Sequence, residues 1–387
     1  MSDGKRQPTV LFTAFEPSGD AHAAPVIARL RALRPDLEVV AWGGPKMAEA
    51  GAHLVASTAE DGAMGLGGLS RARMLFRERA KMIEWFRDRR LVLHVGVDSP
   101  SANTRLASVS EGHDAPYVQF VAPQFWAWGP WRLRRFKRMA SQVLCVLPFE
   151  EAWFAKRGMS VRYVGHPVVN EPPKPESIAA ERAALELPDG APRMVVLPGS
   201  RRSEVVANMP VFARVVEGLI DSYPGLAVTV VAAKPELVGL IRDSMPSELA
   251  GALPIVDHGL HGVLDWADFA LCTSGTVSLD LALQQVPMLG VYMVGLISKL
   301  GSPFVLSMPD RLLPNILAER RIVPEFVPYR GSHEPILQIA RELLGDPSRL
   351  ALMSESLKAV VDSFGTHDPA QESVDALLEL LPPSEDT

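Results

Sequence analysis

Residues 9–20 read TVLFTAFEPSGD, a β-rich apolar run that breaks at a proline and a glycine, and helical spacing follows over residues 21–33. A short apolar run bounded by glycine or proline predicts a buried strand, and the spacing after it predicts a helix. The same order recurs from residues 37–42, 91–97 and 117–121. Repeated strand, loop and helix units predict a parallel sheet with helices on both faces.

A second series of such units follows a proline-rich stretch. Predicted strands at residues 143–147 and 161–164 close the first series, and the second series has predicted strands at residues 194–197, 227–232, 254–256, 269–272 and 288–291. Pro172 and Pro173 indicate a linker between the two series. We therefore predict two doubly wound, Rossmann-like α/β domains that face a cleft, over residues 1–170 and 171–360. A terminal helix within residues 361–387 is expected to cross back to the first domain before a polar tail.

The composition is that of a globular enzyme, with 387 residues, 47% hydrophobic and 22% charged. The formal net charge of -6 argues against a general nucleic-acid partner, although a local basic patch could still bind an anionic ligand or a membrane. Cys145 and Cys272 lie in apolar runs, which predicts reduced core thiols and a cytoplasmic protein. No apolar run reaches the ~18 residues of a membrane span, so we expect neither a signal peptide nor a transmembrane helix.

Ligands of doubly wound sheets bind outside the carboxyl ends of the strands. The polar residues that follow the predicted strands are Glu16, Asp98, Gln124, His166, Arg201 and Ser274. His166 is a candidate hinge or donor contact, although a lone histidine is more often structural. No histidine pair has the spacing of metal ligands, and no GxGxxG or P-loop pattern occurs, so neither a metal site nor a dinucleotide site is predicted.

Two loops of the second series are suited to a diphosphate. In Pro198-Gly199-Ser200-Arg201 the backbone N–H groups, the hydroxyl and the forked guanidinium can all donate to phosphate oxygens. Thr273-Ser274-Gly275-Thr276 precedes a helix predicted over residues 277–285, so its N–H groups could stabilise a leaving phosphate. A solvated turn and an ordinary helix N-cap are the respective alternatives.

Taken in order, these loops resemble the lipid-A-disaccharide synthases, a family of the glycosyltransferase-B type. The resemblance rests on nine segments: EPSGD at 16–20, GGPKM at 43–47, GVDSP at 96–100, VAPQFWAW at 121–128, LPFE at 147–150, GHP at 165–167, LPGSR at 197–201, SGT at 274–276 and LPN at 313–315. Each segment is short, but nine in the same order cover nearly the whole chain.

The resemblance implies an inverting, metal-independent glycosyltransferase that uses no cofactor. It would move a 2,3-diacylglucosamine unit from UDP-2,3-diacylglucosamine to 2,3-diacylglucosamine 1-phosphate (lipid X), forming a β-1,6-linked disaccharide and UDP. Such enzymes of lipid A biosynthesis are cytoplasmic and bind peripherally to the inner face of the cytoplasmic membrane. The resemblance leaves both a monomer and a homodimer open.

The resemblance also assigns roles to individual residues. The implied donor-binding residues are Ser200, Arg201, Ser274, Gly275, Thr276, Asp280 and Asn315, and the implied acceptor-binding residues are Glu16, Ser18, Asp20, Gln124 and Trp126. Asp280 stands where the family usually has a glutamate that reaches the ribose. Glu325 stands where the family often has an acidic residue near the donor.

Transfer to a primary hydroxyl needs a general base, because an alcohol is a poor nucleophile until its proton is being removed. Asp98, at the end of a predicted strand, is the predicted base, with a helix cap or an Asx turn as the alternative. The family pattern Asp-x-Pro-Asp ends here in Ser101, and the aspartate usually found before the strand is absent at residues 89–92. Asp20 or His113 could therefore serve instead, or turnover could be weak.

Two segments combine apolar side chains with cations. Residues 121–131 hold Phe125, Trp126, Trp128 and Trp131 and are followed by five cations, which suits a sugar 1-phosphate at a membrane surface. A core aromatic cluster beside a solvated helix is the alternative. Residues 64–86 predict an interfacial helix or an acyl-chain groove, or else an amphipathic core helix, and the family's glutamate near their start is replaced by glycine-rich residues 65–68.

Two further functions fit the same scaffold. One is a related UDP-sugar transferase or an epimerase with another acceptor, which would act on a non-acylated UDP-sugar. The other is a UDP-sugar-binding protein that has lost turnover, and the missing aspartates favour it.

Overall fold

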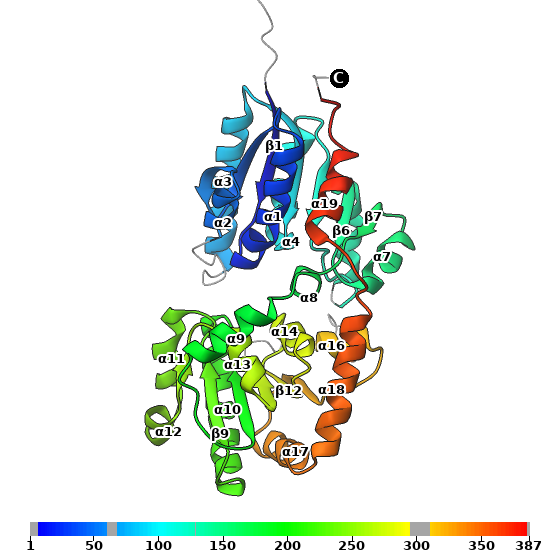
Figure 1. Cartoon of the computed structure of the whole chain (residues 1–387). Coiled ribbons are helices and arrows are strands. Elements are labelled where there is room, and N and C mark those ends of the chain that lie inside the picture. Colours follow the sequence, from blue (N-terminus) through cyan, green and yellow to red (C-terminus); the bar gives the residue numbers. More distant parts are fainter. Residues whose placement is uncertain (1–6, 60–67, 128, 295–309, 385–387) are drawn as a thin grey trace, which may run out of the picture. The chain divides into compact units, whose positions relative to one another are not determined.

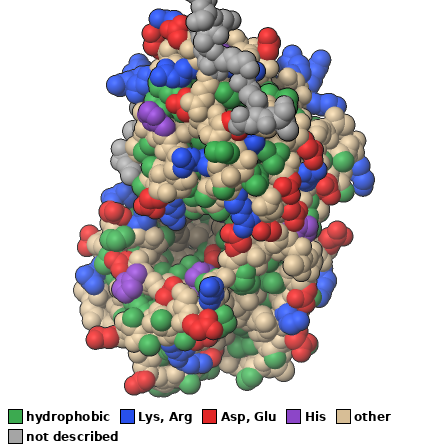
Figure 2. All heavy atoms as spheres, turned by 45° about the horizontal axis from the view of Figure 1, so that its top comes forward, with side chains coloured by type: hydrophobic (Ala, Val, Ile, Leu, Met, Phe, Trp, Pro, Cys, Tyr) green, Lys and Arg blue, Asp and Glu red, His purple; other side chains and the backbone are tan. Residues whose placement is uncertain are grey.

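A computed structural model describes residues 7–59, 68–127, 129–294 and 310–384. The chain divides into two compact units, one formed by Met1–Asn170 with Thr366–Thr387 and the other by Glu171–Gly365 (Figure 1). In the described part of the chain, no helix is long and apolar enough to cross a membrane. Cationic and anionic side chains are interspersed over the face drawn in Figure 2, as expected of a solvated surface.

The described residues of the first unit form a seven-stranded parallel sheet in the order β3-β2-β1-β4-β5-β6-β7. Its strands are β1 (Pro8–Thr13), β2 (Glu38–Gly43), β3 (His53–Ser57), β4 (Arg90–Val97), β5 (Tyr117–Phe120), β6 (Gln142–Cys145) and β7 (Val161–Tyr163). The chain winds outward from β1 to β3 and then returns to place β4 on the other side of β1. The strand order therefore reverses between β1 and β4, and this reversal is where such sheets bind ligands.

The helices of the first unit mostly follow strand ends through a proline. They are α1 (Pro17–Leu33), α2 (Pro45–Glu49), α3 (Gly68–Phe86), α4 (Pro100–Leu106), α5 (Ser108–Glu111), α6 (Leu133–Met139), α7 (Pro148–Ala155), α8 (Pro167–Asn170) and α19 (Pro369–Leu378). Proline suits the first helical turn because its φ is already helical and its missing N–H is not needed there. The terminal helix α19 packs against α1, where Arg29 pairs with Asp368.

The second unit repeats the plan with a six-stranded parallel sheet in its described residues, in the order β10-β9-β8-β11-β12-β13. Its strands are β8 (Arg193–Leu197), β9 (Ala227–Val231), β10 (Ile255–Val256), β11 (Phe269–Cys272), β12 (Met288–Met293) and β13 (Glu325–Tyr329). Its helices are α9 (Pro175–Ala184), α10 (Arg202–Ser222), α11 (Val238–Asp243), α12 (Ser247–Ala252), α13 (Leu260–Trp266), α14 (Val277–Leu283), α16 (Leu313–Leu317), α17 (Glu334–Leu344) and α18 (Pro347–Asp362). Here the strand order reverses between β8 and β11.

Both sheets are covered by helices, so their central strands are buried on both faces. Every residue of β9 and β11 is buried, as are all but the first residue of β1 and β8. Strands buried in this way are nearly continuous apolar runs, which is why the sequence reveals them. Cys145 and Cys272 are buried free thiols of these strands. The predicted fold class, two doubly wound Rossmann-like domains, is confirmed, while β3 and β13 are strands that the sequence analysis does not predict.

Candidate active site

In the first unit, four polar side chains meet where the strand order reverses. The Ser18 hydroxyl, at the start of α1, donates to Oδ2 of Asp98 at 2.7 Å. The Ser99 hydroxyl donates in the opposite direction, to Oε1 of Glu16 at 2.8 Å. These hydrogen bonds join the loops after β1 and β4, and they hold two carboxylates together at the carboxyl edge of the sheet.

Asp98 is placed by an unusual backbone. Asp98 and Ser99 both have positive φ, 52° and 36°, a conformation that side chains other than glycine rarely adopt. The residue that precedes α4 is Ser99, and it makes no side-chain cap, so Asp98 does not cap that helix. Oδ2 of Asp98 accepts from the Ser18 hydroxyl. Among the described residues, Oδ1 accepts from the N–H of the adjacent Ser99. The carboxylate is half-buried, so it can meet a ligand.

Asp20, expected to bind the acceptor or to replace the base, makes structural contacts. Its buried carboxylate accepts from the N–H groups of Gly44, Lys46 and Met47 at 3.0 to 3.1 Å, and so caps α2. A Cβ added at Gly44 would lie 2.5 Å from Oδ2 of Asp20, so glycine is needed for this approach. Both oxygens of Asp20 accept from backbone donors, so these contacts are structural, and its roles as acceptor ligand or base stay predictions.

The aromatic segment divides between core and surface. Trp126, expected to bind the acceptor, is buried: its ring packs on Phe149 at 4.9 Å and its Nε1 donates to Glu150 at 2.9 Å. Burial raises the pKa of Glu150 to about 7, against the hydrogen bonds that it accepts. Gln124 is exposed at the carboxyl edge, Trp131 is 63% exposed, and residue 128 lies outside the described residues. The core interpretation therefore holds for Trp126.

His113 cannot replace Asp98, because it precedes β5 at the amino edge of the sheet and packs on Phe86. His22, to which no sequence motif points, lies close enough to Asp98 for their charges to interact. His22 is one helical turn beyond Ser18, and its ring meets His166 at 6.4 Å. Burial lowers the pKa of His22, with Asp98 opposing this shift and Lys46 adding to it. Burial, reinforced by His22, lowers the pKa of His166 to about 3.

In the second unit, the loop after β8 is built around Glu204. Both N–H groups of Ser200 and Arg201 donate to Oε2 of this buried carboxylate, at 3.1 and 3.2 Å. Gly199 has φ of 127°, and a Cβ there would lie 2.6 Å from Cβ of Glu204. Glu204 occupies both N–H groups in this structure, and their contact with a phosphate stays a prediction. The Ser200 hydroxyl and the guanidinium of Arg201, which Glu204 also anchors at 2.7 Å, remain as phosphate donors.

The loop after β11 lies beside the loop after β8, because the two strands are neighbours in the sheet. Thr273 N donates to the carbonyl of Leu197 at the end of β8, as the reversal of strand order requires. Among the described residues, the N–H groups of Ser274, Gly275 and Thr276 have no hydrogen-bond partner. A side chain added at Gly275 would meet only open space. This loop retains the donors that a phosphate needs.

Asn208 on α10 joins three loops of this edge, and no motif pointed to it. Its buried amide donates to the carbonyl of Pro198 at 2.9 Å and to the hydroxyl of Thr273 at 3.2 Å, and its oxygen accepts from Met293 N at 2.8 Å. The only sequence signal was a polar residue on the apolar face of α10.

The remaining donor candidates, Asp280 and Asn315, differ in burial and in their hydrogen bonds. Asp280 is half-buried in the first turn of α14, and burial raises its pKa to about 6. Asn315 is buried and bonds to Ile322, Val323 and Glu325 through both its amide atoms. Glu325 in turn accepts from Arg311 N and Leu312 N. Asn315 and Glu325 therefore hold the segments on either side of α16 through internal contacts, and the donor-binding role of Asn315 stays a prediction.

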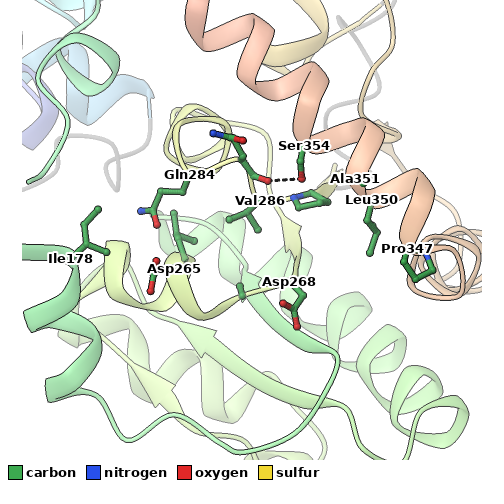
Figure 3. A pocket seen from close by; sticks show the side chains of 13 residues that line it. Ile178, Asp265, Asp268, Gln284, Val286, Pro347, Leu350, Ala351 and Ser354 are labelled. Carbon is green, nitrogen blue, oxygen red and sulfur yellow. Dashed lines mark hydrogen bonds between the residues drawn. The ribbon is translucent and has the colours of Figure 1, made fainter. Parts of the chain in front are cut away.

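The second unit also contains a cavity of about 500 Å³ at its opposite edge (Figure 3). Asp268 and Pro287 line it and directly precede β11 and β12, so it lies at the amino ends of these strands. The cavity is thus separate from the loops after β8 and β11. Within the described ranges, no group of three or more His, Cys, Asp or Glu residues could hold a metal ion.

The family model for lipid-A-disaccharide synthetase matches residues 10–366. The chain belongs to the lipid-A-disaccharide synthase family. It is 34% identical to the lipid-A-disaccharide synthase of Myxococcus xanthus, over 97% of this chain and 98% of the relative. It is 30% identical to the lipid-A-disaccharide synthase of Gluconobacter oxydans, over 96% of this chain and 90% of the relative.

Solved structures agree on the fold at much lower identity. A UDP-GlcNAc 2-epimerase from Neisseria meningitidis bound to UDP-GlcNAc matches with a TM-score of 0.67 at 12% identity, covering 96% of this chain and 99% of that one. An S. aureus MnaA-UDP co-structure matches with a TM-score of 0.65 at 14% identity, over 97% of this chain and 99% of that chain. Lipid-A-disaccharide synthases are glycosyltransferases, and the predicted glycosyltransferase-B type is confirmed for this member of the family.

Proposed function

We propose that this chain transfers 2,3-diacylglucosamine from UDP-2,3-diacylglucosamine to lipid X, with inversion, forming the β-1,6 disaccharide and UDP. The observation that carries the proposal is the pair of hydrogen bonds that hold Asp98 and Glu16 at the edge of the first sheet. Family membership supplies the reaction, and these two carboxylates supply a base and an orienting group for a sugar hydroxyl.

In the acceptor step, the Asp98 carboxylate takes the proton of the 6-hydroxyl of lipid X. The oxygen forms a bond to C1 of the donor sugar while the bond from C1 to the phosphate oxygen breaks, and the electron pair leaves on UDP. A carboxylate suits this task because it is negative and accepts only. Glu16 and Ser18 orient the acceptor, the exposed Gln124 follows β5 at the same edge of the sheet, and the first unit is the acceptor domain.

In the donor step, the second unit binds UDP. The guanidinium of Arg201, anchored by Glu204, offers charged donors to the diphosphate, and Ser200 adds a hydroxyl. The N–H groups of Ser274, Gly275 and Thr276 receive the negative charge that grows on the leaving phosphate. The Asp280 carboxylate, in the first turn of α14, accepts from the ribose hydroxyls.

We also propose that the first unit binds the cytoplasmic face of the inner membrane through α6 and α3. Trp131 precedes α6 and is 63% exposed, and Arg134, Arg135, Lys137 and Arg138 on α6 are exposed cations. On α3, Phe76 is 70% exposed. Exposed aromatic and aliphatic side chains beside cations favour an interface with anionic lipids.

The test is mass spectrometry of the lipid phase after incubation with UDP-2,3-diacylglucosamine and lipid X. We expect the parent to form the disaccharide, and Asp98→Ala and Arg201→Ala to lose it. Asp88→Ala and Arg202→Ala, which change exposed residues of the same types, are the matched controls and should keep it. Epimerisation of a non-acylated UDP-sugar without disaccharide, or UDP binding without turnover, would replace the proposal by one of the alternatives.

A further inference from the structure

The left-handed backbone at Asp98 is held by two buried side-chain amides. Nδ2 of Asn103 on α4 donates to the carbonyl of Asp98 at 2.6 Å, and Nε2 of Gln119 on β5 donates to the same carbonyl at 3.1 Å. Both side chains are fully buried. The N–H of Asp98 donates to the carbonyl of Phe120 at 2.9 Å, so the whole peptide environment of this residue is fixed.

Hydroxyl groups fix the orientation of both amides. The Thr13 hydroxyl donates to Oδ1 of Asn103 at 2.9 Å, and the Tyr117 hydroxyl donates to Oε1 of Gln119 at 2.6 Å. The NH₂ groups face carbonyl oxygens only: those of Val97 and Asp98 for Asn103, and those of Asp98, Phe120 and Val121 for Gln119. A flipped amide would place its oxygen against these acceptors, so each NH₂ group must point to the carbonyl of Asp98.

The chain of hydrogen bonds behind Asn103 has one direction only. Thr13 has one proton, which it donates to Asn103, so it must accept from Nε2 of His94 at 2.9 Å. His94 is buried and its pKa is lowered to about 3 by burial, so the ring is neutral and Nδ1 is an acceptor. Nδ1 therefore accepts from the Ser110 hydroxyl at 2.9 Å. The donor and the acceptor are thereby known for each hydrogen bond of the chain that runs from Ser110 through His94, Thr13 and Asn103 to the carbonyl of Asp98.

Gly96 on β4 makes room for this network. A Cβ at residue 96 would lie 2.4 Å from the hydroxyl of Tyr117 and 2.9 Å from Cβ of Asn103. The glycine is not needed for a positive φ, because the φ of Gly96 is not positive. Its role is therefore the space that the two amide supports occupy.

We propose that Asn103 and Gln119 are positioning residues that hold Asp98 in its left-handed conformation, so that its carboxylate stays at the carboxyl edge beside Ser18. The inference rests on the proposed function, because that function makes Asp98 the base. Strained residues other than glycine persist where the surrounding structure over-determines them, and they cluster at active sites. Two donors on one carbonyl provide that over-determination.

The test uses the full chain with Asn103→Leu and Gln119→Met, which keep side-chain size but remove the donors. We expect crystal structures of both variants to show Asp98 without positive φ. We expect kcat for disaccharide formation to fall about 100-fold, the size of effect that a displacement of about 1 Å has on a catalytic group. KM for UDP-2,3-diacylglucosamine and UDP binding should not change, because the donor residues lie in the other unit.

Tyr117→Phe is the milder variant, since it removes only the hydroxyl that orients Gln119 and leaves both amides. It should lower kcat less than Gln119→Met and shift the acidic limb of kcat against pH, which a simple loss of folded protein would not move. The matched control is Thr9→Val, which removes a buried hydroxyl bonded to Glu38 at 3.0 Å at the amino edge of the same sheet. It should leave kcat and its pH profile unchanged.

A positive φ at Asp98 in both donor variants, or parental kcat in their folded fraction, would overturn the inference. If the parent forms no disaccharide, the proposed function fails, and the conformation of Asp98 in the variant crystals still decides the role of the two amides.

Discussion

The two places where strand order reverses have the same topology and opposite chemistry. Between β1 and β4 the loops present carboxylates and hydroxyls, with Asp98 and Glu16 at the edge. Between β8 and β11 they present Arg201 and a run of backbone N–H groups. The first edge can accept a proton and the second can receive an anion. The fold therefore decides where ligands bind, and the loop residues decide which step each unit performs.

Within each edge, the carboxylates divide by the donors that they face. Asp20 and Glu204 accept from two or more backbone N–H groups, and they shape loops. Asp98 and Glu16 accept from serine hydroxyls, which can rotate toward another partner, and Asp98 accepts in addition from one backbone N–H, that of Ser99. A hydroxyl can be replaced by a substrate hydroxyl, whereas a backbone amide in a loop cannot. This difference separates a reactive carboxylate from a structural one.

Asp98→Asn tests the reactive side of this comparison and should have the largest effect. The amide keeps the size of the side chain but cannot take a proton, so kcat should fall about 1000-fold, within the range of general-base catalysis. Calorimetry should show parental UDP affinity, because UDP binding is assigned to the other unit. A comparable loss of kcat in the surface control Asp88→Asn would show that the assay reports folding rather than a base.

Asp20→Ala tests the structural side. Three backbone N–H groups would lose their acceptor, so the free energy of unfolding should fall by about 3 kcal/mol in urea denaturation. The protein that stays folded should keep most of its kcat. A variant of parental stability that has lost kcat would instead return Asp20 to the list of reactive residues.

The sequence allowed the fold to be predicted where strands are buried on both faces. The central strands are continuous apolar runs, whereas β3 and β13 are partly exposed edge strands and were missed. Residues 325–329 read EFVPY, and a proline inside a strand is tolerated at the edge of a sheet. β7 and β10 are also partly buried edge strands, and their short apolar runs are nevertheless visible, so the polar ends of β3 and β13, more than the edge position alone, hide these two strands.

The sequence also led to the two edges, but not to the partner of each polar side chain. Asp20, Trp126 and Asn315 lie in the expected loops and are nevertheless occupied by internal hydrogen bonds. Those partners come from segments distant in the chain, such as Gly44 for Asp20 and Glu150 for Trp126. Only tertiary packing decides whether a polar residue at a strand end faces a ligand or the protein itself.

Glu150 is a structural carboxylate, and its contribution to the free energy of unfolding should depend on pH. Burial raises its pKa in the folded state from 4.5 to about 7, so the folded protein binds the proton more tightly than the unfolded chain. The associated stability is fully present below pH 4.5 and is lost as the pH rises through about 7. Between pH 5 and pH 8 the free energy of unfolding of the parent should fall by about 2 kcal/mol through this group.

Glu150→Gln should remove this fall, since the amide does not titrate. Urea denaturation at pH 5 and pH 8 measures it, and the fluorescence of Trp126, the hydrogen-bond donor to Glu150, should follow the same pH dependence. The control Glu151→Gln changes the neighbouring carboxylate, which is more accessible, and should retain the parental pH dependence. The same slope in the parent and in Glu150→Gln would mean that the buried carboxylate does not control it.

On the donor side, Asp280 is the carboxylate that we propose contacts the ligand. Replacing it should have the smallest effect of the four substitutions. Burial raises its pKa to about 6, so it is charged at pH 8 and mostly neutral at pH 5. Asp280→Asn should weaken UDP binding about tenfold at pH 8, the loss of one hydrogen bond to a charged group, and hardly at all at pH 5. Calorimetric titration of UDP at both pH values measures this difference, with Asp243→Asn on α11 as the control. An equal loss at both pH values would show that Asp280 acts through shape rather than charge, and it would then belong with Asp20 and Glu204.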